Sequence, residues 1–179
     1  GKDPAMTYAN AYGSTLAQSD CIVIFTPRGM GPHAWQGDEA KQRQIRRRFQ
    51  LIGTTADTQR VWDIRRAVQV IRQVCTSLKA PPVIRGEPSL QELVLLATLF
   101  ESVSGPQVLA NVTADPKKWP DILNLTRTIT PQELVALVAL RNEISATPES
   151  GDVTAFTEKL ADDERWRTVG VSPPVHPHR

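Results

Sequence analysis

The chain has 179 residues, which is enough for one domain of ordinary size. Apolar residues make up 40% of it and charged residues 22%, which is typical of a globular protein rather than a disordered or fibrous one. The net charge of +2 lacks the large basic excess of most nucleic-acid binders. The longest apolar run, residues 93–100, is too short for a membrane-spanning helix of roughly 20 residues. We therefore expect a soluble protein, with neither membrane nor nucleic acid favoured as a partner.

The chain offers few groups for metal or cofactor chemistry. Two cysteines cannot form a disulfide framework or a four-ligand zinc site. Of the three histidines, His176 and His178 lie in a Pro-rich tail, and His33 follows the first apolar run. No phosphate-binding loop with the Gly-x-x-x-x-Gly-Lys pattern is present. We expect no cofactor and no metal ion.

The chain divides into three parts. Residues 1–5, directly before Met6, look like a remnant of cloning, and residues 6–170 form a single domain. Residues 171–179 form a flexible tail. No signal peptide is apparent at the start, and the native compartment stays unknown.

Short apolar runs predict strands, and apolar residues spaced by three and four predict helices. Ser89 with Glu92, and Thr130 with Glu133, have the spacing of capping boxes at helix starts. Asp57 or Thr58 is expected to cap the helix predicted at 57–78. Cys75 lies on the apolar stripe of that helix, which is typical of a core residue rather than a nucleophile. In chain order the predicted elements are a strand at 21–26, helices at 38–51 and 57–78, a strand at 81–86, a buried helix at 90–101, a strand at 107–112, a short helix at 119–125, and helices at 131–144 and 152–166.

The predicted helix at 38–51 is strongly basic. Its cations crowd together, and two interpretations follow: a solvated amphipathic helix, or a surface that meets an anionic partner. A steep salt dependence of polyanion binding would support the second. The cations are Lys41, Arg43, Arg46, Arg47 and Arg48.

Alternating strands and helices predict an α/β fold: a three-layer α/β/α sandwich with a mostly parallel sheet. Three strands are few for an open sheet, so further strands are expected within residues 8–18 and 167–171, or the chain is part of a larger fold. A small sheet leaves bare edges. We therefore expect self-association through exposed sheet edges, with the oligomeric state open.

The order of these elements resembles the middle of an α/β-hydrolase, similar to the acetyl-xylan-esterase-like and S9-peptidase-like hydrolases. The resemblance rests on Ile22-Val-Ile-Phe-Thr-Pro-Arg-Gly-Met-Gly31, on Val61-Trp-Asp-Ile-Arg-Arg-Ala67, on Ala97-Thr-Leu-Phe-Glu101 and on residues 121–136. It implies a truncated hydrolase core acting on a small ester or peptide substrate.

That family places its nucleophile in a Gly-x-Ser-x-Gly turn. Here the matching stretch is Gly86-Glu-Pro-Ser-Leu90, so Pro88 occupies the nucleophile position. Ser89 is one residue late, and it is interpreted either as a helix cap or as a displaced nucleophile. No complete triad is present, so enzymatic activity is left open. The resemblance implies a degenerate or incomplete hydrolase; the alternative is a non-catalytic binding or accessory module that binds anions through the Arg43 to Arg48 face.

Overall fold

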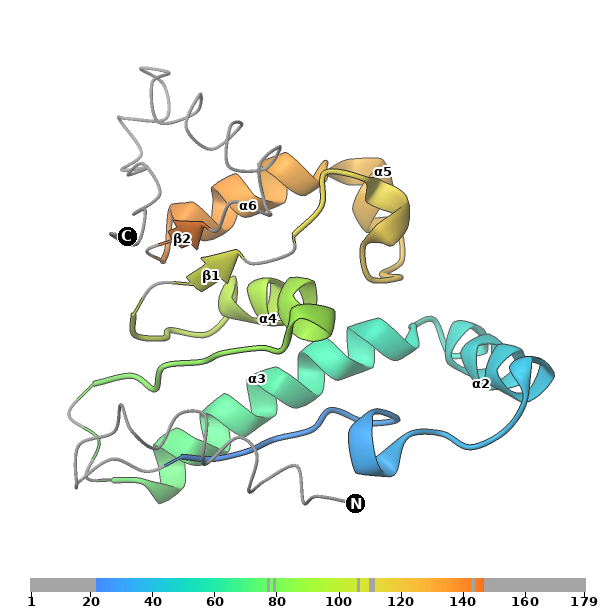
Figure 1. Ribbon diagram of the computed structural model, residues 1–179, viewed down its shortest axis with the longest axis horizontal. Coiled ribbons are helices and arrows are strands. Elements are labelled where there is room, and N and C mark those ends of the chain that lie inside the picture. The colour runs from blue at the N-terminus through green and yellow to red at the C-terminus, as the bar shows by residue number, and fades with distance from the viewer. Residues whose placement is uncertain are drawn as a thin grey trace.

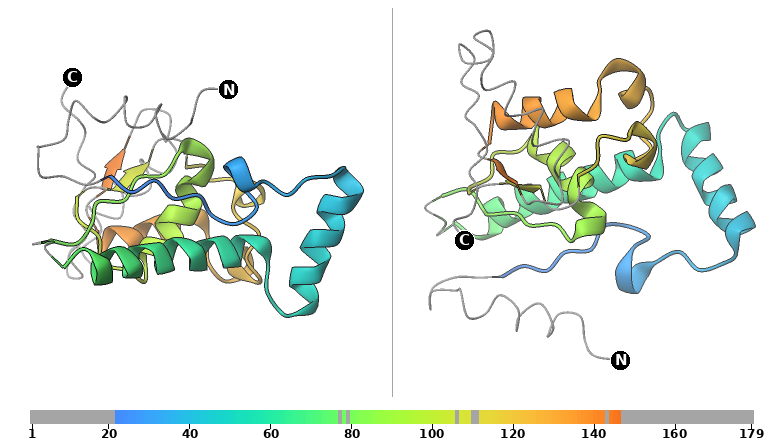
Figure 2. Two further views of the ribbon diagram at one scale, coloured as in Figure 1. Left: turned by 90° about the horizontal axis from the view of Figure 1, so that it is seen from below. Right: turned by 45° about the horizontal axis from the view of Figure 1, so that its top comes forward.

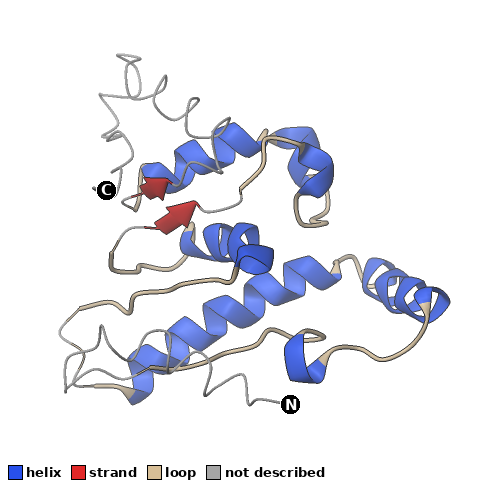
Figure 3. Cartoon of the chain, in the orientation of Figure 1, coloured by secondary structure: helices blue, strands red, loops and turns tan. Residues whose placement is uncertain are grey.

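A computed structural model describes residues 22–76, 78, 80–105, 107–109, 112–142 and 144–146, and this part of the chain is mainly helical (Figures 1 and 3). The elements in chain order are η2 (Gly31–His33), α2 (Glu39–Leu51), α3 (Ala56–Val74), η3 (Pro88–Leu90), α4 (Gln91–Thr98), β1 (Gln107–Leu109), η4 (Pro116–Lys118), α5 (Leu125–Thr128), α6 (Pro131–Ala139) and β2 (Ile144–Ala146), where η marks a 3-10 turn.

The core forms around α4, which lies between α3 and α6 (Figure 1). The sequence predicted a helix that is apolar nearly all round and therefore central, and this is confirmed: every residue of α4 except Glu92 is buried. The first half of the predicted stripe of α3 is also confirmed, since Val61, Ile64 and Val68 are buried. Its second half is wrong, because α3 ends at Val74 and Leu78 beyond it is 44% exposed. From α6, Val135 and Val138 are completely enclosed.

A buried carboxylate joins α3 to the end of α4. Glu101 is 7% exposed, and its Oε1 accepts hydrogen bonds from Arg65 Nε at 3.1 Å and Gln69 Nε2 at 2.7 Å. Its Oε2 lies 4.0 Å from a guanidinium nitrogen of Arg72. The Arg65 guanidinium also stacks on Phe100, 4.7 Å from the ring centroid. Charge pairing and stacking therefore fix the edge of the core where the two helices meet.

The helix caps are only partly those predicted. The capping box of α6 is confirmed: Thr130 Oγ1 accepts from Glu133 N at 3.2 Å, and Thr130 N donates to Glu133 Oε2 at 2.8 Å. These hydrogen bonds hold the pKa of Glu133 below its ordinary value. The cap of α3 was assigned wrongly, because Thr55 accepts from Thr58 N at 3.1 Å.

The capping box predicted at Ser89 is wrong. Residues Pro88–Leu90 form the 3-10 turn η3, and α4 then begins after Leu90 with no side-chain cap. Pro88 presets φ for this turn, which moves the helix start beyond the reach of the Ser89 hydroxyl.

The predicted α/β sandwich is wrong, because the described residues contain no sheet that could form its middle layer. Residues 22–26 are extended but unpaired, with the side chains from Ile22 to Phe25 between 39% and 53% exposed. The run at 81–86 contributes one isolated bridge, Val83 to Ser104. Within the third run, Gln107–Leu109 forms a strand that pairs in parallel with Ile144–Ala146, and residues 110 and 111 lie outside the described part of the chain. Two three-residue strands cannot be covered by helices on both faces in the way the family fold requires.

Two further expectations depended on that sheet. Self-association through exposed sheet edges loses its basis, since the described part of the chain has no extended sheet edge of the kind expected. The α/β-hydrolase-like core and its esterase-like class are also contradicted, because in the described residues the parallel pairing is limited to β1 and β2, which is too small to carry a nucleophile turn inside a sheet.

Several predictions fall outside the described residues. These are the remnant at 1–5, the additional strands at 8–18 and 167–171, the helix at 152–166, and the tail at 171–179 with His176 and His178. The short helix expected at 119–125 is displaced: the turn η4 precedes it and α5 begins only at Leu125. No helix in the described ranges combines the length and the apolar character that crossing a bilayer requires.

Candidate anion-binding surface

Helix α2 lies at one end of the molecule, away from α4 and α6, in all three views (Figures 1 and 2). It contributes no buried residue. Asp38 caps its start, where the side chain accepts from Lys41 N at 2.9 Å, and Glu39 occupies the first turn. Acidic groups at the start and arginines toward the end both match the helix dipole, so α2 is stable locally while its outer surface stays free.

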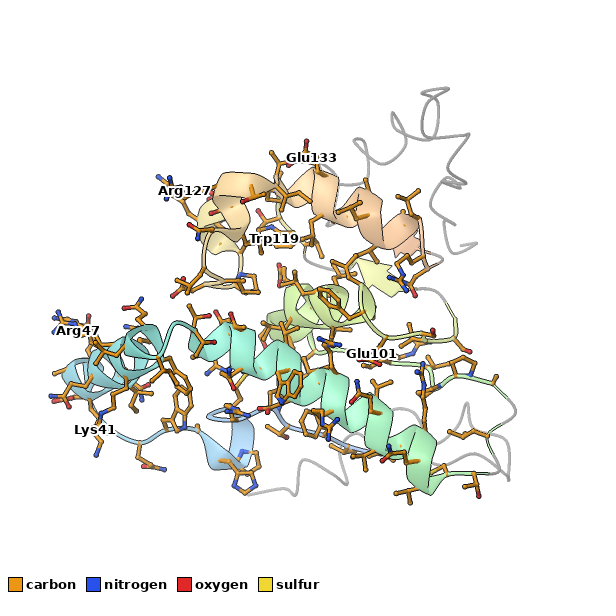
Figure 4. The ribbon with its side chains drawn as sticks, turned by 180° about the vertical axis from the view of Figure 1, so that it is seen from behind. Lys41, Arg47, Glu101, Trp119, Arg127 and Glu133 are labelled. Carbon is orange, nitrogen blue, oxygen red and sulfur yellow. The ribbon has the colours of Figure 1, made fainter. Side chains whose placement is uncertain are left out.

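Three arginines of α2 share one face. Arg43 and Arg47 are four residues apart and so lie in one row on the helix, on the side opposite the inward-facing Ile45 and Phe49. Arg46 lies beside this row, about 60° around the helix from Arg43, whereas Arg48 lies on the other side of the row, about 100° from Arg47. We call Arg43, Arg46 and Arg47 the basic face; all three are exposed, as is Arg48. Figure 4 shows Arg47 and Lys41 extending outward from different sides of α2.

These cations are almost free of ion pairs within the described residues. Among the described residues, Lys41, Arg46, Arg47 and Arg48 make no ion pair, and Arg43 pairs only with the 82% exposed Glu39, at 3.0 Å. An exposed pair of this kind contributes about 0–1 kcal/mol, so it does not compete with a strongly anionic ligand.

Arg28 and Arg60, by contrast, hold parts of the fold together. Arg28 donates to Asp63 from Nε at 2.7 Å, and its backbone N donates to the same carboxylate at 3.1 Å. Burial alone would raise the pKa of Asp63, but the hydrogen bonds and charge of Arg28, with the charge of Arg60, hold that pKa below its ordinary value. Arg60 pairs with Asp57 at 2.7 Å, and the second oxygen of Asp57 accepts from Asp121 N at 2.8 Å.

Trp35 fixes α2 to the rest of the molecule. Its ring packs against Phe49 of α2, with the centroids 5.6 Å apart, and Arg60 of α3 lies over the other part of the same ring at 5.3 Å. The backbone oxygen of Trp35 accepts from Gln42 Nε2. Gly29 makes room for the ring, since a Cβ there would lie 2.4 Å from Trp35 Cε2. Trp35 therefore connects α2, which carries the basic face, to α3.

Sequence reasoning found the basic face but missed this support. Trp35 carries no periodic signal because it lies in the loop between η2 and α2. The sequence signal for this support is the pair of glycines Gly29 and Gly31. Both have positive φ and so form a tight loop beside the Trp35 ring.

The other predicted site residues do not come together. Ser89 is exposed in η3, and within the described residues its hydroxyl has no hydrogen-bonded histidine or carboxylate. His33 is exposed in η2, and Cys75 is half-buried at the end of α3. The described ranges hold no group of three or more His, Cys, Asp or Glu side chains that could hold a metal ion.

The chain matches no known family model, no curated protein and no solved structure. The α/β-hydrolase resemblance is therefore overturned on two grounds, the absence of a matching family and the helical packing of the described residues. The expected ester or peptide hydrolase activity depended on that resemblance. The remaining interpretation is that the basic face of α2 meets an anionic partner.

Proposed function

We propose that this chain is a non-catalytic binding module that takes an anionic partner on the basic face of α2. One observation supports the proposal: the cations of α2 are exposed, and nearly all make no ion pair with a described residue, on a helix that contributes no buried residue. Arg28, Arg60 and Arg65, by contrast, are paired with carboxylates of the fold. Unpaired cations that share one helix face raise the local concentration of anions and speed their association.

The helix spacing supports binding to an extended array of charges rather than to a single anion. Arg43 and Arg47 are about 6 Å apart along the helix axis, at about 1.5 Å per residue, and Arg46 lies beside them. No side chain closes over this surface, since all three arginines are exposed. A row of phosphates or carboxylates can therefore meet several guanidinium groups at once, and each guanidinium offers paired donors to one acidic group.

The test uses a single-stranded poly(dT) oligonucleotide as a polyanion probe, with binding followed by fluorescence anisotropy. The double variant Arg46→Gln/Arg47→Gln is compared with wild type. The matched control is Lys117→Gln/Lys118→Gln, which removes the same charge from the exposed turn η4. We expect weakened binding only for the α2 variant. Equal weakening by both variants would mean that net charge alone drives binding, and the proposal would then be wrong.

A further inference from the structure

The end of α2 carries two aliphatic side chains that the fold leaves in solvent. Leu51 is 85% exposed and Ile52 is 75% exposed, more than any other large apolar residue of the described chain. Single exposed apolar residues are common on protein surfaces. Here, however, two neighbours are exposed together, and they lie beside the basic face.

This exposure is built into the backbone. Thr54 N donates to Phe49 O at 3.1 Å and Gly53 N donates to Gln50 O at 3.0 Å, which is the bonding pattern of a Schellman motif. Gly53 has φ of +74°, the left-handed conformation that this motif requires. The turn closes the helix directly after Leu51 and Ile52, so their positions at its tip are fixed rather than the result of fraying.

The aliphatic tip, formed by Leu51 and Ile52, adjoins the arginines of α2, and Ile52 lies four residues after Arg48. Leu51 lies four residues after Arg47 and three after Arg48, so it is their neighbour on the helix. Leu51 also continues the row of Arg43 and Arg47, on the side turned away from Trp35 and Phe49. A flat anionic partner that meets the arginines along this row therefore meets Leu51 at the same time.

We infer that the anionic partner is a lipid surface: arginines of the basic face bind acidic headgroups while Leu51 and Ile52 insert between acyl chains. This inference rests on the proposed function and names its partner class. Peripheral attachment to a bilayer combines basic side chains with apolar groups that reach the acyl boundary. Nucleic acids are bound instead through cations and stacked aromatic rings, and the tip of α2 carries aliphatic side chains.

The experiment measures sedimentation of the full chain with two kinds of vesicle: phosphatidylcholine alone, and phosphatidylcholine mixed with phosphatidylserine. The double variant Leu51→Ser/Ile52→Ser removes the aliphatic tip. Both side chains are mostly in solvent, so the core is unaffected. The matched control is Val74→Ser, which changes a 73% exposed apolar residue at the far end of α3.

Wild type and Val74→Ser should sediment with the phosphatidylserine vesicles and not with phosphatidylcholine alone. Leu51→Ser/Ile52→Ser should lose affinity for these vesicles by on the order of tenfold or more, because two aliphatic side chains no longer leave water. Its affinity for poly(dT) should stay that of wild type.

Two results would overturn the inference while leaving the proposed function intact. One is binding of poly(dT) but not of phosphatidylserine vesicles, which would make nucleic acid the partner class. The other is vesicle binding that is unchanged in Leu51→Ser/Ile52→Ser, which would make attachment purely electrostatic. Failure to bind either probe would contradict the proposed function as well.

Discussion

The salt dependence of polyanion binding measures how many cations of the basic face act together. Each phosphate that is neutralised releases bound counterions, so the logarithm of the binding constant falls linearly with the logarithm of salt concentration, with a slope of about −0.7 per contact for single strands. A strand that follows Arg43, Arg46 and Arg47 makes about three contacts, which gives a slope of about −2.1. Replacing Arg46 and Arg47 by Gln leaves one contact and a slope of about −0.7.

These slopes convert into affinities that are easily told apart. Between about 50 and 200 mM salt, wild type should lose about 18-fold in affinity for poly(dT), and Arg46→Gln/Arg47→Gln only about 2.6-fold. The assay is fluorescence anisotropy titration at four or more salt concentrations, with Lys117→Gln/Lys118→Gln as the control. If the α2 variant and wild type had the same slope, the three arginines would not act as one surface and the reasoning would be refuted.

Three further predictions concern the stability of the fold that carries this surface. Glu101→Gln should lower the free energy of unfolding in urea by about 2 kcal/mol, because Arg65 loses its charged partner, whereas the exposed Glu39→Gln should cost under about 1 kcal/mol; equal losses would contradict the role of the buried pair. Burial raises the pKa of Glu92 above its ordinary 4.5, so its carboxyl costs stability as pH rises through the folded-state pKa. At neutral pH, Glu92→Gln should therefore unfold at a higher urea concentration than wild type. Well below pH 4.5 the two should unfold at the same urea concentration, and a gain in stability that persists there would exclude ionisation of Glu92 as the cause. Gly29→Ala should lower the thermal midpoint more than Gly53→Ala does, because both have positive φ but only the Gly29 Cβ meets Trp35; an equal shift would mean that the ring moves aside freely.

The helices were predictable because helical periodicity is a local property. The stripe of α3, the buried α4 and the capping box at Thr130 each follow from residues within a few turns of one another. Their ends were less accurate. The helix expected to run to residue 144 stops at Ala139, and the next apolar residues belong to a loop and to β2.

The strands were not predictable from apolar runs alone. A run of four or five β-branched and aromatic residues predicts a strand only if a partner strand exists, and partners are distant in sequence. The run from Ile22 to Phe25 has the composition of a buried strand but no partner among the described residues, so its side chains are about half exposed. The α/β assignment, and the family resemblance that followed its order, both depended on that missing pairing.

The basic face could be predicted from the sequence, but the long-range contacts that support it could not. The crowding of cations from Arg43 to Arg48 is visible in the sequence, and it correctly indicates an exposed helix face. What holds this face in place is not visible, because the contacts of Trp35 join a loop, α2 and α3. Ser89 shows the opposite case, in which a local cap signal was overridden by the turn that Pro88 favours.

The burial of α4 has a consequence for the order in which the chain folds. A helix of eight residues is too short to be stable by itself in water, whereas the nineteen residues of α3 are long enough to form transiently. α3 can therefore serve as the template on which α4 condenses, and the amides of α4 should exchange with deuterium only through global unfolding. The amides of α2, with no buried side chain to protect them, should exchange by local opening long before. The surface proposed to bind partners thus belongs to a unit that opens independently of the core, so a ligand bound there acts on α2 without disturbing α4.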